Sequence, residues 1–339
     1  KVIMITGDHP ATALAIARSA GIETQAGVIT GAGLAAFSAQ ALTERLREAR
    51  VFARIVPEQK LRIVEALKAA GEVVAMTGDG VNDAPALEAA HIGVAMGRKG
   101  TDVAREAADL VLLDDSFASI VGGVRLGRRI FSNLRRALTY ITAVHVPIAG
   151  LALAPILLGL PPMLLPMHVV LLELVIDPTC SLVFEAEPSD EDAMRRPPRP
   201  PDEPLFGLRE IGVADLQGLG VMAAGMGLYA WLLANPAAGE LEARGAGYVA
   251  LVVGALVLAL TDSARSGRLF APHRRIFWGI AVAITAVLAV MFAAPPIASI
   301  FDVATPAPGH LLLALLAGTV GGGWTVLGRM LPDRRAAAA

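Results

Sequence analysis

The pattern of apolar and polar residues divides the chain into two unlike regions. Up to about Ser119, short apolar runs alternate with amphipathic stretches and are bounded by glycine, aspartate or proline. The apolar runs predict buried strands at residues 2–5, 51–53, 72–76, 92–95 and 110–113. The stretches between them predict helices at residues 10–20, 41–50, 57–70 and 83–90. Alternating strands and helices favour a parallel sheet with helices on both faces.

Beyond Arg136 the pattern changes to long apolar runs with few charges. A helix needs about 20 apolar residues to cross a bilayer, and most of these runs approach that length. We therefore expect six membrane-spanning helices, at residues 138–160, 163–184, 211–234, 246–264, 276–295 and 309–328. The chain then divides into a water-exposed α/β region, residues 1–119, and a transmembrane region, residues 120–339.

Arginines are distributed unevenly among the segments that connect these runs. Six spans taken in order leave only Arg244 among the basic residues on one side of the membrane. The other side receives a large group of arginines that includes Arg135, Arg195 and Arg274. By the positive-inside rule, the arginine-rich side is cytoplasmic, and with it the α/β region and both ends of the chain.

Composition agrees with an integral membrane protein. The 339 residues are 55% hydrophobic and 18% charged, and their mean hydropathy is +0.58, which is too apolar for an ordinary soluble protein. The formal net charge is −2, from 29 basic and 31 acidic residues, which excludes a disordered chain and argues against a nucleic-acid partner. A single cysteine, Cys180, excludes an internal disulfide framework and a zinc site built on paired cysteines.

Candidate chemistry lies in short segments after the predicted strands, where ligands collect in parallel sheets. Thr6, Gly7 and Asp8 follow the first strand, Lys60 lies early in a helix, and the string GDGVNDAP follows the strand that ends at Met76. Glycines in such turns let backbone N–H groups approach an anion, and a following helix N-terminus favours negative charge. We expect these segments to bind a phosphoryl group, whose charge Lys60 would neutralise.

The same string carries two carboxylates four residues apart, Asp79 and Asp83. Such a pair can hold a hard cation such as Mg²⁺, with waters and a phosphate oxygen completing the coordination. A Thr-Gly-Asp turn alone is also common as a simple helix cap. The longer GDGVNDAP string is much more specific.

Together these segments resemble the phosphorylation domain of P-type cation ATPases. The resemblance rests on residues 4–8, 53–60 and 76–87, continues through 93–97 and 107–115, and covers essentially the whole chain. It implies a haloacid-dehalogenase-like (HAD-like) α/β fold with a Rossmann-type parallel sheet, followed by an α-helical transmembrane bundle. It also implies Mg²⁺ as cofactor, ATP as substrate, and a transported cation and the lipid bilayer as partners.

The resemblance assigns a role to each matching residue. Thr6 and Gly7 would hold the phosphoryl group, and Lys60 would stabilise it. Asp79 would bind Mg²⁺, and Asn82 and Asp83 would complete that site. The candidate catalytic residues are therefore Thr6, Gly7, Asp8, Lys60 and Asn82. The candidate cofactor-binding residues are Thr6, Gly7, Gly78 and Asn82.

Other parts of the family pattern do not occur in the sequence. There is no Asp-Lys-Thr-Gly motif, so the aspartate that the family phosphorylates is missing. The nucleotide-binding domain, the actuator domain and the first four membrane helices would precede Lys1. Because the strand with the phosphorylated aspartate is central, we expect an incomplete sheet. We interpret the chain as the C-terminal portion of a pump, inactive without its N-terminal part; a truncated, non-catalytic membrane subunit is an alternative.

Ionisable residues inside membrane spans are costly and usually functional. Glu173 and Asp177 are four residues apart, so a helix presents both on one face. Pro178 has no N–H to offer the carbonyl of Leu174, which leaves that oxygen as a further ligand. This segment is therefore a candidate cation site.

His145, in the preceding span, is a third candidate ligand. It precedes Pro147, which frees the carbonyl of Ala143 in the same way. Two unwound helices that present carboxylates and carbonyls are typical of transporter ion sites. A buried histidine bonded to a backbone carbonyl would give the same pattern.

The calcium pump of the sarcoplasmic reticulum provides the nearest ion-site pattern. Asp177 matches an ion-binding aspartate of that pattern, whereas Glu173 and His145 stand where it has asparagine, and Ile148 where it has glutamate. Calcium takes six to eight oxygen ligands, so we expect a single-site pump for Ca²⁺ or Mn²⁺, and the imidazole favours Mn²⁺. The alternative is a proton pump in which Asp177 or Glu173 carries the proton. The Ala/Arg-rich composition suits a bacterial plasma membrane.

Overall fold

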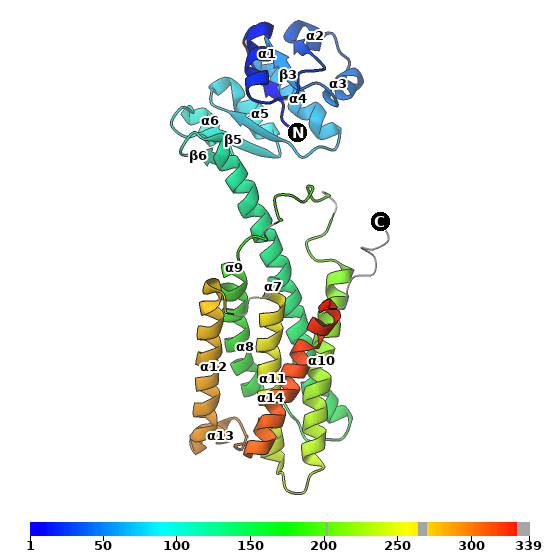
Figure 1. Cartoon of the computed structure of the whole chain (residues 1–339), viewed down its shortest axis with the longest axis vertical. Coiled ribbons are helices and arrows are strands. Elements are labelled where there is room, and N and C mark those ends of the chain that lie inside the picture. Colours follow the sequence, from blue (N-terminus) through cyan, green and yellow to red (C-terminus); the bar gives the residue numbers. More distant parts are fainter. Residues whose placement is uncertain (191, 201–202, 264–269, 331–339) are drawn as a thin grey trace. The chain divides into compact units, whose positions relative to one another are not determined.

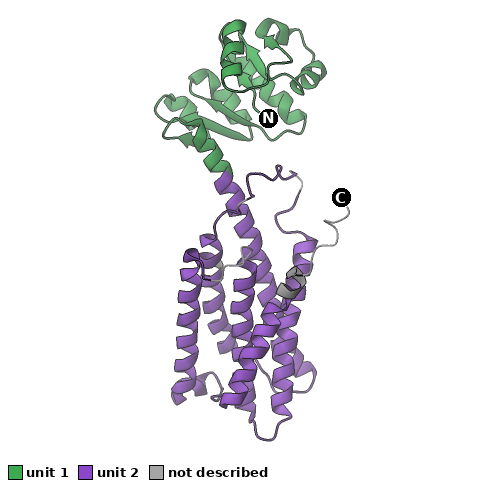
Figure 2. Cartoon of the chain, viewed as in Figure 1, with its two compact units in different colours: residues 1–124 green, residues 125–339 purple. Residues whose placement is uncertain are grey.

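The computed structural model describes residues 1–190, 192–200, 203–263 and 270–330. These residues form two compact units, Lys1–Val124 and Arg125–Ala339 (Figures 1 and 2). Each unit is described by itself below.

Unit 1, residues 1–124, contains six short strands, and every strand pairing is parallel, as predicted. The strands form two three-stranded sheets instead of one, in the orders β1-β3-β2 and β4-β5-β6. β1 and β4 are therefore edge strands. The strands are β1 (Met4–Ile5), β2 (Val28–Thr30), β3 (Val51–Ala53), β4 (Ala75–Gly78), β5 (Ile92–Met96) and β6 (Leu110–Leu112).

The helices of unit 1 begin and end where local signals place them. Pro57 occupies the first turn of α4, and Gly71, with φ of +82°, follows its C-terminus. The side chain of Thr30 caps α2 by accepting from the N–H of Gly33. These helices are α1 (Pro10–Ser19), α2 (Gly31–Ala35), α3 (Ala39–Leu46), α4 (Pro57–Ala69), the 3₁₀ turn η1 (Val81–Asp83), α5 (Ala84–Ala89) and α6 (Asp102–Glu106).

One hydrophobic cluster connects the two sheets. Phe52 of β3 and Met76 of β4 belong to it, together with Ile63 of α4 and Leu87 of α5. Because both sheets pack on the same helices, the missing strand pairing does not split the core. The sheets nevertheless share no backbone ladder.

Unit 2 is helical. Five helical segments among the described residues are long and apolar enough to cross a membrane: 117–157, 166–186, 208–233, 240–263 and 272–293. The sixth expected span, 309–328, coincides with α14, whose last side chains are not described, so the count of six stays a prediction. Residue 264, the end of the fourth expected span, lies outside the described residues.

Most of these helices begin and end close to the predicted residues, but α7 does not. α7 starts before the expected span and runs for 41 residues without a break. The elements are α7 (Phe117–Leu157), α8 (Pro166–Pro178), the π-helical η2 (Thr179–Val183), α9 (Phe184–Ala186), α10 (Leu208–Leu233), α11 (Glu240–Ser263), η3 (Pro272–Arg274), α12 (Arg275–Ala293), α13 (Pro295–Ile300) and α14 (Pro308–Met330).

Glycines allow α10, α11 and α14 to approach closely. A Cβ added at Gly318 of α14 would lie 2.5 Å from the carbonyl oxygen of Ala250 in α11. A Cβ at Gly254 of α11 would lie 2.7 Å from the side chain of Val221 in α10. Small residues at helix contacts are the usual means of tight packing in membranes. α11 is accordingly the most enclosed of the five candidate spans, and α12 the least.

Arg244 forms hydrogen bonds with several segments at one end of unit 2. Its side chain is 3% exposed and donates to the carbonyls of Pro162 (3.0 Å) and Asp302 (2.8 Å) and to the carboxylate of Glu240 (2.6 Å). It also pairs with the carboxylate of Asp302. The arginine that breaks the charge asymmetry of the sequence is thus a buried structural group.

Candidate functional site

The first candidate loop follows β1 and is anchored by the segment after β3. The carbonyl of Thr6 accepts from the N–H of Ile55 (3.1 Å), and that of Asp8 accepts from the N–H of Arg54 (3.1 Å). The N–H of Asp8 donates to Thr6 Oγ1 (3.1 Å). Gly7 is exposed, and a Cβ added there would meet no atom within 4 Å. The loop is fixed at both ends and leaves space around its glycine.

The second candidate loop follows β4 and folds around the side chain of Asp83. Asp83 Oδ2 accepts from the N–H groups of Asp79 (3.3 Å) and Gly80 (3.4 Å). A Cβ added at Gly78 would lie 2.5 Å from the Cβ of Asp83. Glycine is therefore required at position 78 by this chain's own packing, because the aspartate lies directly against the backbone.

Lys60 of α4 binds the other oxygen of the same carboxylate. Its Nζ lies 2.5 Å from Asp83 Oδ1, and the two side chains are only 18% and 8% exposed. The sequence had placed both residues at the site, but their pairing was not predicted. The opposite charges of Lys60 and Asp83 were the only feature of the sequence that could have indicated this pairing.

The oxygen donors near this loop are suited to Mg²⁺ in kind, since the metal prefers carboxylate and carbonyl oxygen. Asp79 and Asn82 are exposed, and their side chains make no hydrogen bond or ion pair in the described structure, whereas Asp83 is bound by Lys60 and two N–H groups. Among the described residues, no three His, Cys, Asp or Glu side chains gather as a metal-binding group. Asp79 is the carboxylate best placed to accept a cation.

The structure does not join the two loops directly. Residues 1–124 are all described, and within them no hydrogen bond or ion pair connects Thr6, Gly7 or Asp8 with Lys60 or Asp83. Each loop instead follows an edge strand of a different sheet. One core thus holds both candidate groups, and no hydrogen bond or ion pair joins them directly.

In unit 2, His145 of α7 and Glu173 of α8 lie near one another. His145 Nε2 is 3.9 Å from Glu173 Oε1, and the two side chains are 53% and 43% exposed. The ring Nδ1 is 2.7 Å from the carbonyl oxygen of Ile141, its partner one turn earlier. Asp177 is exposed, and it does not complete a group of three potential metal ligands in the described part of the chain.

The expectation of two unwound helices was wrong. α7 stays helical through Pro147. A Cβ at Gly218 of α10 would collide with the carbonyl oxygen of Ala143, so this freed oxygen faces α10. The carbonyl of Ala143, which the sequence assigned to the cation site, therefore lies at the close contact between α7 and α10.

The helix around Pro178 widens but does not unwind. After Pro178, α8 continues as the π-helical turn η2. The hydroxyl of Thr179 donates to the carbonyl of Val175 (2.8 Å), and that of Ser181 to the carbonyl of Asp177 (2.5 Å). π-helical turns relieve a disturbed hydrogen-bond ladder and are frequent at functional sites. These hydroxyls satisfy two nearby carbonyls. The carbonyl of Leu174 receives no hydrogen bond from Pro178, because proline has no backbone N–H.

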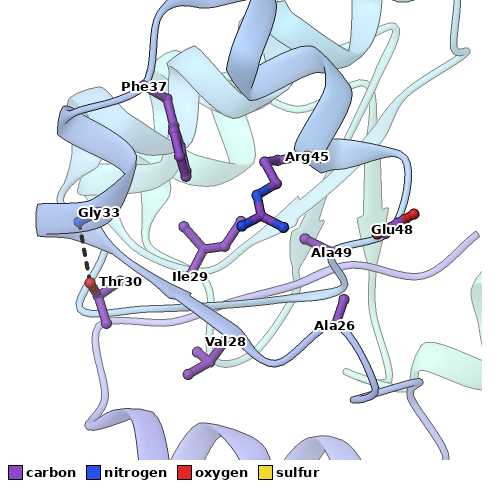
Figure 3. A pocket seen from close by; sticks show the side chains of 9 residues that line it. All are labelled: Ala26, Val28, Ile29, Thr30, Gly33, Phe37, Arg45, Glu48 and Ala49. Atoms are coloured by element: carbon purple, nitrogen blue, oxygen red, sulfur yellow. Dashed lines mark hydrogen bonds between the residues drawn. The ribbon is translucent and has the colours of Figure 1, made fainter.

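A separate pocket of about 220 Å³ lies beside β2 (Figure 3). Phe37 and Ile29 supply apolar walls, and Arg45 also lines the pocket. None of the predicted site residues lines it. The candidate phosphate-binding residues thus lie outside this pocket.

Two family models match the chain. The model described as "Cation transporting ATPase, C-terminus" matches residues 161–331, and the haloacid dehalogenase-like hydrolase model matches residues 1–91. The chain belongs to the P-type cation-transporting ATPases. The HAD-like fold expected for unit 1 and the membrane character of unit 2 are both confirmed.

Relatives of this ATPase family match most of the chain. A probable cation-transporting ATPase F of Mycobacterium tuberculosis is 44% identical over 313 residues, which cover 89% of this chain and 34% of that protein. A calcium-transporting ATPase of Bacillus subtilis is 43% identical over 213 residues, which cover 62% of this chain and 24% of that protein. A sodium/potassium-transporting ATPase subunit alpha of Drosophila melanogaster is 41% identical over 261 residues, which cover 69% of this chain and 25% of that protein. The chain spans about a quarter to a third of the length of these relatives.

Proposed function

We propose that this chain supplies part of the phosphorylation site and part of the ion path of an ATP-driven pump. Such a pump couples formation and hydrolysis of an aspartyl phosphate to transport of a divalent cation, Ca²⁺ or Mn²⁺. The observation that carries this proposal is the loop after β4, in which Lys60 and the backbone of residues 79–80 converge on Asp83.

Two of the edge strands, β1 and β4, support a shared phosphate site. β1 ends in the loop with Thr6 and Gly7, and β4 ends in the loop with Asp79 and Asn82. A parallel strand inserted between β1 and β4 would join the two sheets into one seven-stranded sheet. The carboxyl end of that strand would then lie between the two loops. We propose that this strand carries the phosphorylated aspartate and belongs to another part of the pump.

The chain's own residues would then bind and orient the phosphoryl group. Thr6 Oγ1 and the backbone around Gly7 would hold its oxygens, and Lys60 would neutralise its charge. Asp79, with Asn82 and Asp83, would hold Mg²⁺, which when bound offsets the negative charge of the phosphoryl oxygens. Because Lys60 already binds Asp83, the ammonium is held at the loop before any phosphate arrives.

Residues of unit 2 would provide part of the cation path. Glu173 and His145 face each other across α8 and α7, and Asp177 is exposed one turn further along. Exposed carboxylates are costly in a lipid environment, so we propose that further helices of the pump cover this face. Those helices would supply the remaining oxygen ligands.

A proton pump is the second candidate. Of the three candidate ligands His145, Glu173 and Asp177, only His145 and Glu173 come together in the described structure, and their atoms are 3.9 Å apart. One carboxylate is enough for a proton, whereas Ca²⁺ takes six to eight oxygens. We propose a bacterial plasma membrane as the location, with unit 1 on the cytoplasmic side, on the basis of the arginine distribution.

The test is ATP hydrolysis by a longer protein that contains this chain together with its upstream regions. We expect activation by micromolar Ca²⁺ or Mn²⁺, and loss of that activation in Asp177→Asn. Asp215→Asn is the matched control, because Asp215 of α10 has no described side-chain bond and lies outside the site. Activity in chelator that follows pH alone would favour the proton pump, and hydrolysis without either response would contradict both.

A further inference from the structure

A buried carboxylate outside both candidate sites joins several helix ends of unit 2. Glu187 follows α9 and is 5% exposed. Its Oε1 lies 3.7 Å from Nε of Arg274, and its Oε2 lies 3.6 Å from Nε2 of His273, both in η3. Its backbone carbonyl accepts from Arg129 Nε (2.8 Å) and Asn133 Nδ2 (3.0 Å) of α7. We call these five residues the Glu187 cluster.

Other groups complete the surroundings of this carboxylate. Ser263, at the end of α11, also acts to lower the pKa of this carboxylate, while its hydroxyl donates to the carbonyl of Leu260 (3.2 Å). Arg136 of α7 also acts on it but binds Asp190 directly, at 2.6 Å. The cationic neighbours of Glu187 are thus Arg274, His273, Arg136 and Arg129, the last bound to its backbone carbonyl. None of them makes a short, charge-assisted hydrogen bond to the carboxylate.

The distances decide whether the carboxylate is well compensated. Strong ion pairs have donor–acceptor distances of about 2.7–2.9 Å, and the contacts to Arg274 and His273 are longer by most of an ångström. Arg274 is itself buried, and its guanidinium nitrogens have no hydrogen-bond partner in the described structure. Desolvation of a buried charge can then exceed the attraction of its partners. Accordingly, burial raises the pKa of Glu187 even though Arg274, His273 and Arg136 act to lower it.

We propose that Glu187 is a proton-binding site whose occupancy governs contact between the end of α8–α9 and the start of α12. Taking up a proton removes the cost of burying the carboxylate, so the closed cluster holds its proton more tightly than an open one does. By linkage, a lower pH favours the closed cluster, and ionisation at higher pH favours separation of these helix ends.

The consequence for transport rests on the proposed function. α8 carries Glu173 and Asp177, and it continues through η2 and α9 to Glu187. A proton taken up or released at Glu187 would therefore accompany movement of the helix that bears the cation ligands. Glu187 itself touches no transported ion in this arrangement; it is a positioning residue.

The decisive variant is Glu187→Gln in the 339-residue chain, reconstituted in lipid nanodiscs. A purely structural ion pair and a proton site predict opposite results. Loss of an ion pair would leave Arg274 buried without a counter-charge and would speed hydrogen exchange. A proton site predicts that the neutral amide imitates the protonated acid, so exchange at residues 184–190 and 270–276 becomes slower at pH 8 than in the wild type.

Infrared spectroscopy measures the proton directly. We expect a protonated-carboxyl band that titrates at higher pH than exposed glutamates and is absent from Glu187→Gln. Glu185→Gln is the matched control, since Glu185 is exposed two residues away and should leave both the band and the exchange rates unchanged. His273→Asn should keep the band, because the proton resides on Glu187.

Three results would overturn the proposal: no band lost in Glu187→Gln, faster exchange in that variant at every pH, or a band lost equally in Glu185→Gln. If Glu187→Gln does not fold, the wild-type chain still tests the sign. After correction for intrinsic rates, exchange at these helix ends should slow as pH falls, and the reverse trend would contradict the proposal. None of these measurements needs ATP or transport, so their outcome is separate from that of the proposed pump.

Discussion

Asp83 in unit 1 and Glu173 in unit 2 are both candidate cation ligands, yet their surroundings differ. Asp83 is 8% exposed and bound by Lys60 and two N–H groups. Glu173 is 43% exposed, and its nearest charged neighbour, His145, is 3.9 Å away. Asp83 thus finds hydrogen-bonding and charged partners within unit 1. The carboxylate of Glu173 has no close partner in the described part of unit 2. Stability and function should therefore be coupled at Asp83 and separable at Glu173.

The largest effect should come from removing the partner of the buried charge. Lys60→Met keeps the length of the side chain but leaves Asp83 without its ammonium. Breaking a buried pair in this way typically costs about 3–5 kcal/mol. Hydrogen exchange in α4 and β4, followed through denaturant unfolding, measures the loss. The double variant with Asp83→Asn should recover part of it; equal stability of Lys60→Met and the wild type would show that the pair contributes nothing.

The next effect separates the two glycine loops. Gly78→Ala places a Cβ 2.5 Å from that of Asp83, so the loop or the aspartate must move. Overpacking of this kind costs about 1–3 kcal/mol. Gly7→Ala is the control, because no atom lies within 4 Å of the added methyl group. Thermal unfolding of the two variants should differ clearly, and equal melting temperatures would contradict the packing described here.

The exposed pair in unit 2 should matter little for stability. Glu173→Gln removes one charge of a pair that is half exposed, and such pairs contribute about 0–1 kcal/mol. We expect the unfolding transition of unit 2 to move hardly at all. His145→Asn should behave in the same way. A loss as large as that of Lys60→Met would mean that the face is already satisfied within this chain.

The smallest effect concerns a polar group that is satisfied but fully exposed. The carboxylate of Asp114 accepts from the hydroxyl of Ser119 (2.7 Å) and the N–H of Ser116 (3.1 Å), just before α7. These hydrogen bonds, that of Ser119 first, lower the pKa of Asp114. A lowered acid pKa gives stabilisation that is present at neutral pH and disappears as pH falls through the folded-state value.

Exchange of the amides at residues 116–120 tests this sign. Protection should be present at neutral pH and decrease in acid, and Asp114→Asn should weaken it at neutral pH. Asp115→Asn is a useful neighbour, because Asp115 instead binds the N–H groups of Arg98 and Lys99. Protection that rises in acid would contradict the assignment.

The sequence predicted the parallel α/β arrangement because its signals are local. Pro57 and Gly71 delimit α4 by backbone geometry alone. β2 was missed because its three residues are flanked by glycines and carry no long apolar run. The division into two sheets follows from strand pairing, which is a long-range property that local patterns do not encode.

The candidate site was predictable in composition but not in contacts. The string GDGVNDAP identified Asp79, Asn82 and Asp83, yet the pairing of Asp83 with Lys60 depends on how α4 packs against the loop. Likewise, Pro147 identified a free carbonyl at Ala143, but only helix packing shows that it faces Gly218. Glu187 gave no signal at all, because a glutamate beyond a span resembles a solvated loop residue until its burial is known.

The edge strands β1 and β4 of unit 1 also bear on how the chain behaves in solution. β1 and β4 each present an unpaired row of backbone groups, and the neighbouring Val2 and Val73 are 67% and 64% exposed. Open edges beside apolar side chains are templates for strand addition from another molecule. Concentrated samples of this chain should therefore self-associate through unit 1, and a soluble peptide strand that fills the gap would act as a solubilising partner.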